Sequence, residues 1–250
     1  MTQGSGDTAS KVATVTLAFW VMKICATTVG ETGGDLLSMT LKVGYLASSL
    51  ILIGAFLVTL AAQLAARRFH PFLYWAVILS TSTAGTTMSD YMDRTLGLGY
   101  AAGSAILIGL LVSVLALWRL TQGSISVDHI RDRRAEAFYW VAILVSNTLG
   151  TALGDYLADS SGLGYAVSNL IIAGGIALTA LAYRFTSLSR TGLFWAAFVL
   201  TRPFGATMGD LLTKPPVKGG LGVGTLGSTL VLLALLLAVL LFTSRRPARE

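Results

Sequence analysis

Apolar runs of about 20 residues alternate with short polar segments along the whole chain. Each run is long enough to cross the hydrocarbon core of a bilayer as an α-helix. The pattern therefore predicts an all-α, polytopic membrane protein. The eight transmembrane helices are expected at residues 13–34, 43–65, 71–90, 97–118, 136–156, 163–183, 192–212 and 222–243.

The odd-numbered runs repeat one pattern at fixed offsets. In the first copy an aromatic pair, Phe19-Trp20, is followed ten residues after the Trp by Gly30 and five residues later by Asp35. Nine residues beyond the aspartate lies another glycine, which precedes a Tyr in three copies. The aspartates of the four copies are Asp35, Asp90, Asp155 and Asp210. Since each copy contains two runs, we expect four parallel helical-hairpin repeats in a pseudo-fourfold arrangement of two halves.

One membrane domain is expected over residues 1–250, with repeats at about 12–66, 70–120, 135–185 and 190–244. The intervals between successive aspartates are 55, 65 and 55 residues. The longer middle interval accommodates a polar, charged cytoplasmic linker at about 121–135. In the fourth copy Lys214-Pro215-Pro216 lengthens the turn and Val223 replaces the Tyr, so strict fourfold symmetry is not expected.

Small residues and aromatic pairs also recur within the repeats. Glycine or serine stands four residues apart before each aspartate, as at Gly30 and Gly34, and this spacing predicts close packing of helix backbones. The aromatic pairs lie a few residues inside the expected cytoplasmic boundary, where Trp and Tyr anchor helices to lipid headgroups. We therefore expect Phe19-Trp20, Tyr74-Trp75, Tyr139-Trp140 and Phe194-Trp195 to act as interfacial anchors.

Composition and charge agree with a membrane location. The mean hydropathy is +0.72 and only 12% of residues are charged, against about 25% in soluble domains. The single cysteine, Cys25, excludes an internal disulfide framework. The net charge of +6 does not indicate nucleic-acid binding, because the Lys and Arg residues lie mainly on one side of the expected membrane. The positive-inside rule therefore predicts a multi-pass protein with both termini in the cytoplasm. The residues on that side are Lys11, Arg67, Arg68, Arg119, Arg131, Arg133, Arg134, Arg184, Arg190, Arg245, Arg246 and Arg249.

A polar stripe runs along each odd-numbered helix. Four-residue steps keep side chains near one helix face, and steps back from each aspartate meet mostly polar residues. An ionised side chain at the bilayer centre costs about 2.5–3.5 kcal/mol, so these faces are expected to converge on each other, on water or on a ligand. The stripes comprise Lys23, Thr27, Glu31 and Asp35; Ser82, Thr86 and Asp90; Asn147, Thr151 and Asp155; and Arg202 and Asp210.

The stripes predict an ion path with a metal site. The stripes carry five acids against the bases Lys23 and Arg202, a formal charge of −3. Four aspartates at one depth would repel one another unless they hold protons or a cation neutralises them. Oxygen ligands suit Ca²⁺, Mg²⁺ or Mn²⁺, so we expect the four aspartates to bind the metal, with Glu31 as a fifth ligand or proton-coupling group. The neutral oxygens along the path would come from Thr27, Ser82, Thr86, Asn147 and Thr151.

The four Trp–Gly–Asp copies resemble a family of bacterial integral membrane proteins built from four tandem repeats. In that family each repeat has two transmembrane segments and a characteristic tryptophan. The resemblance covers about residues 12–243 and implies the architecture, a bacterial origin and hence the bacterial inner membrane, but no mechanism. A shorter stretch, from Gly30 to Asp35, is similar to the Glu-x-Gly-Asp motifs of cation/proton exchangers for calcium and manganese.

The expected function is a secondary transporter or channel-like carrier for a cation. Two alternatives stay open: a scaffold or sensor whose aspartates only cap helix turns, and an organic-solute carrier that uses Lys23 and Arg202. Those two bases could instead form internal salt bridges with Glu31 or an aspartate. No Walker, GxSxG, HExxH or CxxC motif stands in a supporting context, so neither an enzyme nor a cofactor is expected. The expected partners are the lipid bilayer and a small cation or proton, and a homo-oligomer stays open.

Overall fold

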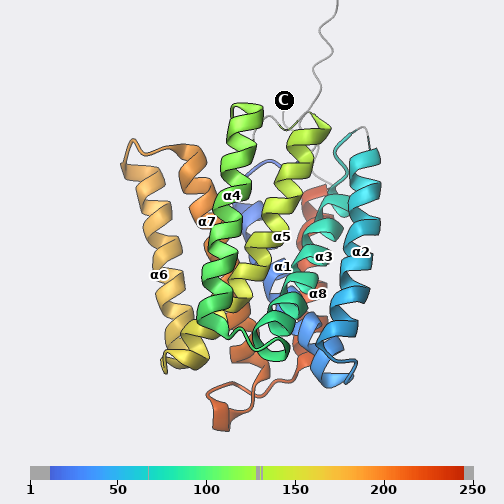
Figure 1. Ribbon diagram of the computed structural model, residues 1–250, viewed down its shortest axis with the longest axis vertical. Helices are drawn as coiled ribbons and strands as arrows, with labels where there is room; N and C mark the ends of the chain where they lie inside the picture. Colours follow the sequence, from blue (N-terminus) through green and yellow to red (C-terminus); the bar gives the residue numbers. More distant parts are fainter. Residues whose placement is uncertain (1–11, 67, 128–129, 131, 245–250) are drawn as a thin grey trace, which may run out of the picture.

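Eight α-helices and no strand form in the part of the chain that the computed structural model describes, residues 12–66, 68–127, 130 and 132–244 (Figure 1). The all-α prediction is therefore confirmed. Part of the predicted linker and six of the basic residues counted above (Lys11, Arg67, Arg131, Arg245, Arg246 and Arg249) lie outside the described residues. The helices are α1 (Leu17–Asp35), α2 (Tyr45–Ala65), α3 (Pro71–Asp90), α4 (Tyr100–Gln122), α5 (Arg133–Asp155), α6 (Gly164–Phe185), α7 (Arg190–Thr213) and α8 (Thr225–Ser244).

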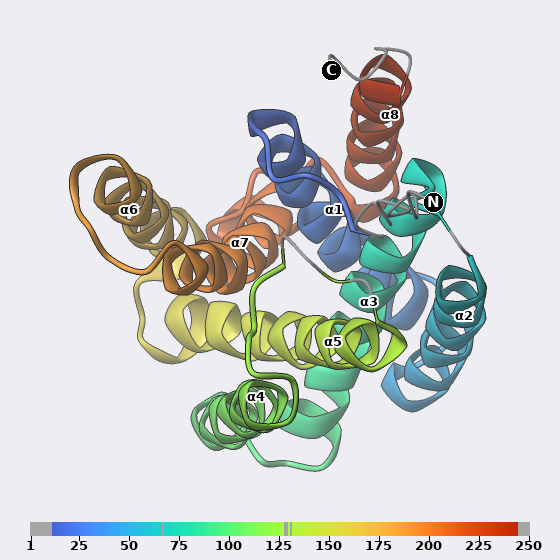
Figure 2. The same ribbon diagram turned by 90° about the horizontal axis from the view of Figure 1, so that it is seen from above.

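The four odd-numbered helices form a closed inner ring. Helix α1 packs against α3, α3 against α5, α5 against α7, and α7 against α1. Figure 2 shows these four helices around the centre, with α2, α4, α6 and α8 outside them. The ring turns one face of every inner helix toward a common axis, and this face carries the polar stripe.

Each outer helix packs against the inner helix of the next repeat. Helix α2 lies on α3, α4 on α5 and α6 on α7, and α8 closes the circle on α1. The expected hairpins are therefore splayed, since α2, α4 and α6 make little contact with the inner helix of their own repeat. A single repeat cannot bury its apolar faces alone, and the four repeats depend on one another for a core.

Five helical segments of the described chain are long and apolar enough to cross a membrane. They are the four outer helices and the segment Arg133–Ser160, which contains α5. Helices α1, α3 and α7 are too polar for that criterion, because protein surrounds them and their polar stripes face the axis.

Side-chain caps and glycines mark the residues at which the helices begin. Every inner helix has a side-chain cap: the Thr16 hydroxyl accepts from Phe19 N at 3.3 Å, and His70, Asp132 and Ser189 accept at the starts of α3, α5 and α7. The outer helices have no such caps in the first three repeats and begin at glycines in the left-handed region, such as Gly44 with φ of +84°. This conformation explains why the repeat requires a glycine nine residues after its aspartate.

The glycines five residues before the aspartates let the inner helices approach closely. A Cβ at Gly150 would lie 2.2 Å from Arg202 Cγ, and a Cβ at Gly30 would overlap Ser82. The same relation recurs around the ring, in agreement with the close packing predicted from sequence. The interlocking pairs are Gly30 with Ser82, Gly85 with Asn147, Gly150 with Arg202, and Gly205 with Thr27.

The first three aspartates are followed by a π-helical turn, at Leu36–Thr40, Tyr91–Thr95 and Tyr156–Ser160. The residue that follows each turn donates its backbone N–H to the carbonyl of the first residue of the turn, as Leu41 N does to Leu36 O at 2.8 Å. Pro216 stands at this position in the fourth repeat and has no N–H, so the turn cannot form. Helix α8 begins at Thr225, after Gly224, so Thr225 rather than Val223 takes the place of the Tyr.

We predict that Gly150→Ala lowers the stability of the protein by about 1–3 kcal/mol, because the new Cβ overlaps Arg202 and Pro203 in a packed interior. Thermal unfolding of the purified protein measures the loss. The control is Gly109→Ala in α4, which meets no atom within 4 Å and should be neutral or stabilising by up to about 1 kcal/mol. Equal effects of the two substitutions would contradict the interlocking of inner helices.

Candidate functional site

The polar stripes of the four inner helices meet along the axis of the ring. All twelve side chains singled out from the sequence are buried. They form layers one helical turn apart, because the eight that are not aspartates lie four, eight or twelve residues before one. Toward the acidic end the layers are Lys23; Thr27, Ser82, Asn147 and Arg202; Glu31, Thr86 and Thr151; and Asp35, Asp90, Asp155 and Asp210.

The four aspartates are joined in two pairs by cationic side chains. Arg94 Nε lies 2.8 Å from Asp90 Oδ1, and an Arg94 Nη lies 3.0 Å from Asp155 Oδ2. Lys214 Nζ lies 2.9 Å from Asp35 Oδ2 and 3.0 Å from Asp210 Oδ1. The aspartates therefore follow twofold rather than fourfold symmetry, with one bridge at the α3–α5 seam and one at the α7–α1 seam.

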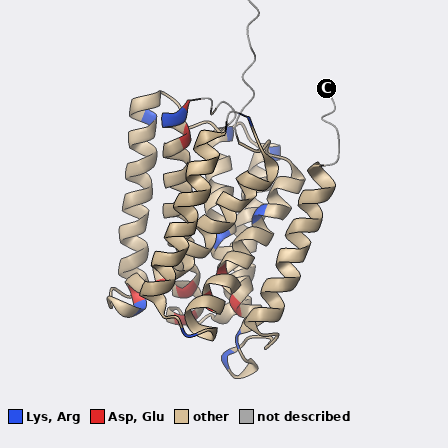
Figure 3. Ribbon diagram, turned by 90° about the vertical axis from the view of Figure 1, so that its right-hand side faces the viewer, with Lys and Arg blue, Asp and Glu red and all other residues tan. Residues whose placement is uncertain are grey.

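Arg94 and Lys214 were missed as site residues by the sequence analysis. Both stand four residues after an aspartate, so continuing the four-residue step forward along the helix face would have found them. The corresponding residues in the first and third copies are Met39 and Asp159, which explains why only two bridges form. Figure 3 shows a group of acidic positions toward the end of the bundle where these bridges lie.

Lys214 lies beyond the end of α7 and stays charged. Burial by itself would lower the pKa of Lys214, but the carboxylates of Asp210 and Asp35 outweigh burial and raise this pKa above its ordinary value. The ammonium group is therefore a tethered cation held against two carboxylates.

Glu31 and Arg202 form the centre of the axis. Both terminal nitrogens of Arg202 lie 3.0 Å from Glu31 Oε2, and both side chains are almost fully buried. One of these nitrogens also donates to Thr86 Oγ1 at 2.5 Å and Thr151 Oγ1 at 2.6 Å. Four inner helices thus meet in one hydrogen-bonded group, and the internal salt bridge considered for Arg202 is confirmed.

Lys23 has no acidic partner among the described residues. Its Nζ lies 3.4 Å from Asn147 Oδ1 and 4.1 Å from the centre of the Phe198 ring. The Asn147 amide in turn donates to Thr81 Oγ1 at 3.0 Å. Lys23 is therefore a fully buried amino group that contacts an amide oxygen and an aromatic face.

The remaining predicted neutral oxygens take part in helix packing. Thr27 Oγ1 donates to Thr201 O at 3.1 Å across the α1–α7 seam. The Ser82 hydroxyl lies against Gly30 of the neighbouring helix. Thr86 and Thr151 differ, because each of their hydroxyls donates to Glu31 Oε2 at 3.3 Å.

Three carboxylates come together in one group. Glu31, Asp35 and Asp210 each offer an oxygen, and these oxygens all lie within 4.8 Å of one another. All three residues are buried. Asp90 and Asp155, which were also predicted as metal ligands, are not part of this group and face Arg94 instead.

The aspartates do not cap the turns that follow them. The first three occupy the N-cap position of a π-helical turn, and none of their side chains makes a capping hydrogen bond. The turn-cap alternative considered from the sequence was therefore wrong for Asp35, Asp90 and Asp155. In the second of these turns Asp93 is buried beside Ser89, and Arg94 bridges two aspartates.

The other end of the axis is closed by aromatic side chains. Seven rings follow one another in a circle, with neighbouring centres 5.1 to 6.4 Å apart. The Tyr74 and Tyr139 hydroxyls within it lie 2.6 Å apart. The expected anchoring of the aromatic pairs at lipid headgroups was wrong for most of these rings, because they are buried against each other. The circle consists of Phe19, Trp75, Tyr74, Trp140, Tyr139, Trp195 and Phe194.

We predict that Glu31→Leu or Arg202→Met alone lowers stability by about 3–5 kcal/mol, since each leaves a buried charge without its partner. The double substitution removes both charges and should regain most of the loss. Unfolding of the four proteins in one double-mutant cycle measures the coupling. A double variant as unstable as the sum of the single variants would contradict a mutually dependent pair.

A family model described as Repeat of Unknown Function (DUF347) matches the chain four times, at residues 18–69, 73–124, 138–189 and 193–248. No curated protein and no solved structure matches the chain. Each matched segment contains one inner helix and the outer helix that follows it, so the family repeat and the structural repeat are the same unit. The chain therefore belongs to the DUF347 family of repeats of unknown function.

Proposed function

We propose that this protein is a secondary transporter that carries a divalent cation of the Mn²⁺, Ca²⁺ or Mg²⁺ type across the bacterial cytoplasmic membrane. All eight helices would span the bilayer, with both termini in the cytoplasm. Basic residues at the end where α1 begins support this orientation under the positive-inside rule. The described ones are Arg68, Arg119, Arg133, Arg134, Arg184 and Arg190.

The group of Glu31, Asp35 and Asp210 carries the proposal. Oxygens that bind one Ca²⁺ at about 2.4 Å cannot lie more than about 4.8 Å apart, and the three carboxylates meet this condition. They come from α1 and α7, so an ion bound here would join two helices at one seam of the ring.

Charge balance favours a divalent ion. The acidic and central layers hold five carboxyl groups, from Glu31 and the four aspartates, and the axis holds four basic side chains, Lys23, Arg202, Arg94 and Lys214, so the formal charges sum to −1. If Lys214 withdraws, the remaining formal charge is −2. One divalent cation restores neutrality, which the low dielectric of a membrane interior demands.

Lys214 would act as a tethered competitor of the transported ion. Its ammonium lies against Asp35 and Asp210, which are two of the three proposed ligands. It stands at the start of the lengthened loop that is peculiar to the fourth repeat, so it can leave without moving an inner helix. Release of the ion would be assisted when the ammonium returns, and Glu31 would remain paired with Arg202 or take up a proton.

A membrane scaffold is the competing function, because every one of the four aspartates already has a cationic partner. In a scaffold these ion pairs would only hold the bundle together. Substitution of an aspartate would then change stability without changing the movement of any ion.

The direct test is Asp35→Asn in proteoliposomes loaded with a Mn²⁺- or Ca²⁺-sensitive dye. We expect a loss of uptake of at least about tenfold, because the amide removes one charge and one strong ligand. The control is Asp159→Asn, an exposed acid at the same end of the bundle that should leave uptake unchanged. Uptake by Asp35→Asn equal to the unchanged protein would reject the proposal.

We further predict that Lys214→Gln tightens binding of the divalent cation by about tenfold, which corresponds to about 1.4 kcal/mol. The tethered competitor is then gone, whereas its carboxylate ligands remain. Isothermal titration of the purified protein measures the affinity.

The matched control is Arg94→Gln, since Arg94 holds Asp90 and Asp155, outside the three-carboxylate group. Its effect on cation affinity should be several-fold smaller. Weaker binding by Lys214→Gln, or equal changes in the two variants, would contradict the competitor role.

A further inference from the structure

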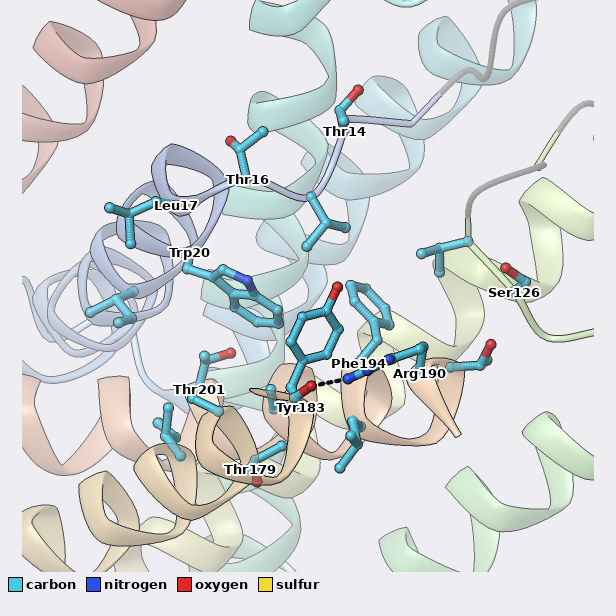
Figure 4. Close-up of a pocket in the computed structure, with 18 residues that line it drawn as sticks. Thr14, Thr16, Leu17, Trp20, Ser126, Thr179, Tyr183, Arg190, Phe194 and Thr201 are labelled. Carbon is cyan, nitrogen blue, oxygen red and sulfur yellow. Dashed lines mark hydrogen bonds between the residues drawn. The ribbon is translucent and has the colours of Figure 1, made fainter. Parts of the chain in front are cut away.

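A cavity of about 660 Å³ lies between α1, α6 and α7. Aromatic rings from all three helices line it: Trp20 from α1, Tyr183 from α6 and Phe194 from α7. Figure 4 shows these rings close together, with Thr14, Thr16 and Ser126 around them. This volume is within the range of sites that bind small organic molecules.

The other repeats show what normally fills such a space. Gln63, Trp118 and Tyr183 are equivalent, since each lies 18 residues after the Tyr near the start of its outer helix. Trp118 is fully buried, and its ring packs against Phe138 and Trp195. An indole therefore fills the gap between α4, α5 and α7. Gln63 is likewise buried, but Tyr183 is 57% exposed and the corresponding gap stays open.

The cavity has an exposed side between α1 and α6. Helices α1 and α6 do not pack against each other, and Figure 2 shows α6 standing apart from α1. The rim includes Leu17, which is 81% exposed, and Phe185 next to the lining residue Tyr183 is 73% exposed. In a membrane-spanning bundle this mouth meets acyl chains, and an apolar cavity open to them will accept one.

One cationic side chain lines the cavity. The guanidinium of Arg190 lies 4.3 Å from the centre of the Tyr183 ring and donates to Tyr183 O. No carboxylate pairs with Arg190 among the described residues. Its charge is thus available to an anionic group at the end of the bundle where α1 begins, and basic sites between transmembrane helices on the cytoplasmic side favour anionic lipid headgroups.

We infer that this cavity binds an anionic phospholipid, with an acyl chain between α1 and α6 and the headgroup phosphate at Arg190. The inference rests on the membrane location in the proposed function but not on cation transport. The inner end of the cavity reaches Ile24 and Thr201. Thr201 O accepts a hydrogen bond from Thr27, so the bound chain touches the α1–α7 seam that also carries the three-carboxylate group.

Binding to the purified full-length protein, without added cation, tests the inference by native mass spectrometry. The probes are phosphatidylglycerol, phosphatidylcholine with the same chains, and palmitate. We expect phosphatidylglycerol to bind about fivefold more tightly than phosphatidylcholine, the contribution of one arginine near an anionic headgroup. Equal binding of the two phospholipids, or tighter binding of palmitate, would overturn the assignment.

Two variants locate the site. Ala180→Trp fills the cavity with an indole, as Trp118 does in the second repeat, and should abolish retention of phosphatidylglycerol. Arg190→Gln should remove the preference for phosphatidylglycerol, while the matched control Arg184→Gln, which does not line the cavity, should keep it. Undiminished binding by Ala180→Trp would overturn the inference even if Arg190→Gln failed to fold.

Discussion

The buried ion pair of Glu31 and Arg202 sets the conditions for the rest of the bundle. Removing two charges from water costs several kcal/mol for each ion, and only close contact with further hydrogen bonds offsets that cost. Thr86 and Thr151 supply these bonds from α3 and α5, while the pair itself joins α1 and α7. The hydrogen bonds of the two terminal nitrogens of Arg202 therefore involve all four inner helices at once, and the closed ring brings these helices together.

The ring also explains the use of glycine. An arginine that crosses the axis needs its own helix close to its neighbours, and Gly150 allows Arg202 to lie against the backbone of α5. At the other three seams the equivalent glycine lies against a smaller side chain, which is Ser82, Asn147 or Thr27. Close packing thus requires the glycine of the repeat at all four seams, although only Gly150 packs against a charged side chain.

Much of this fold follows from periodicity within the chain. The positions of the helices, the fourfold repeat and the polar stripe with its Lys23, Glu31 and Arg202 are all properties of single helices, and single-helix spacing predicts them. Single-helix spacing does not predict which helices become neighbours. Contacts between distant segments decide three features: the pairing of each outer helix with the next repeat, the burial of the aromatic pairs, and the bridge from Arg94 to Asp155. No local pattern encodes these contacts.

The departure from fourfold symmetry makes the two pairs of aspartates chemically different. Four equivalent aspartates on one axis would have no preferred pair, so an ion would meet the same ligands in every direction. Arg94 occupies the Asp90–Asp155 seam with a planar group that bonds to both acids, whereas Lys214 occupies the Asp35–Asp210 seam with a single ammonium at the end of a flexible stem. The ammonium contacts both of its acids through one atom, whereas the guanidinium uses a separate nitrogen for each acid, so the ammonium is more readily exchanged for a metal ion. The third carboxylate, Glu31, lies beside the lysine seam, so the seam with the more exchangeable cation is also the one with the extra ligand. The four repeats supply four similar acids, and the residues at positions 94 and 214 distinguish the α3–α5 seam from the α7–α1 seam, which is the one that the proposed transport would use.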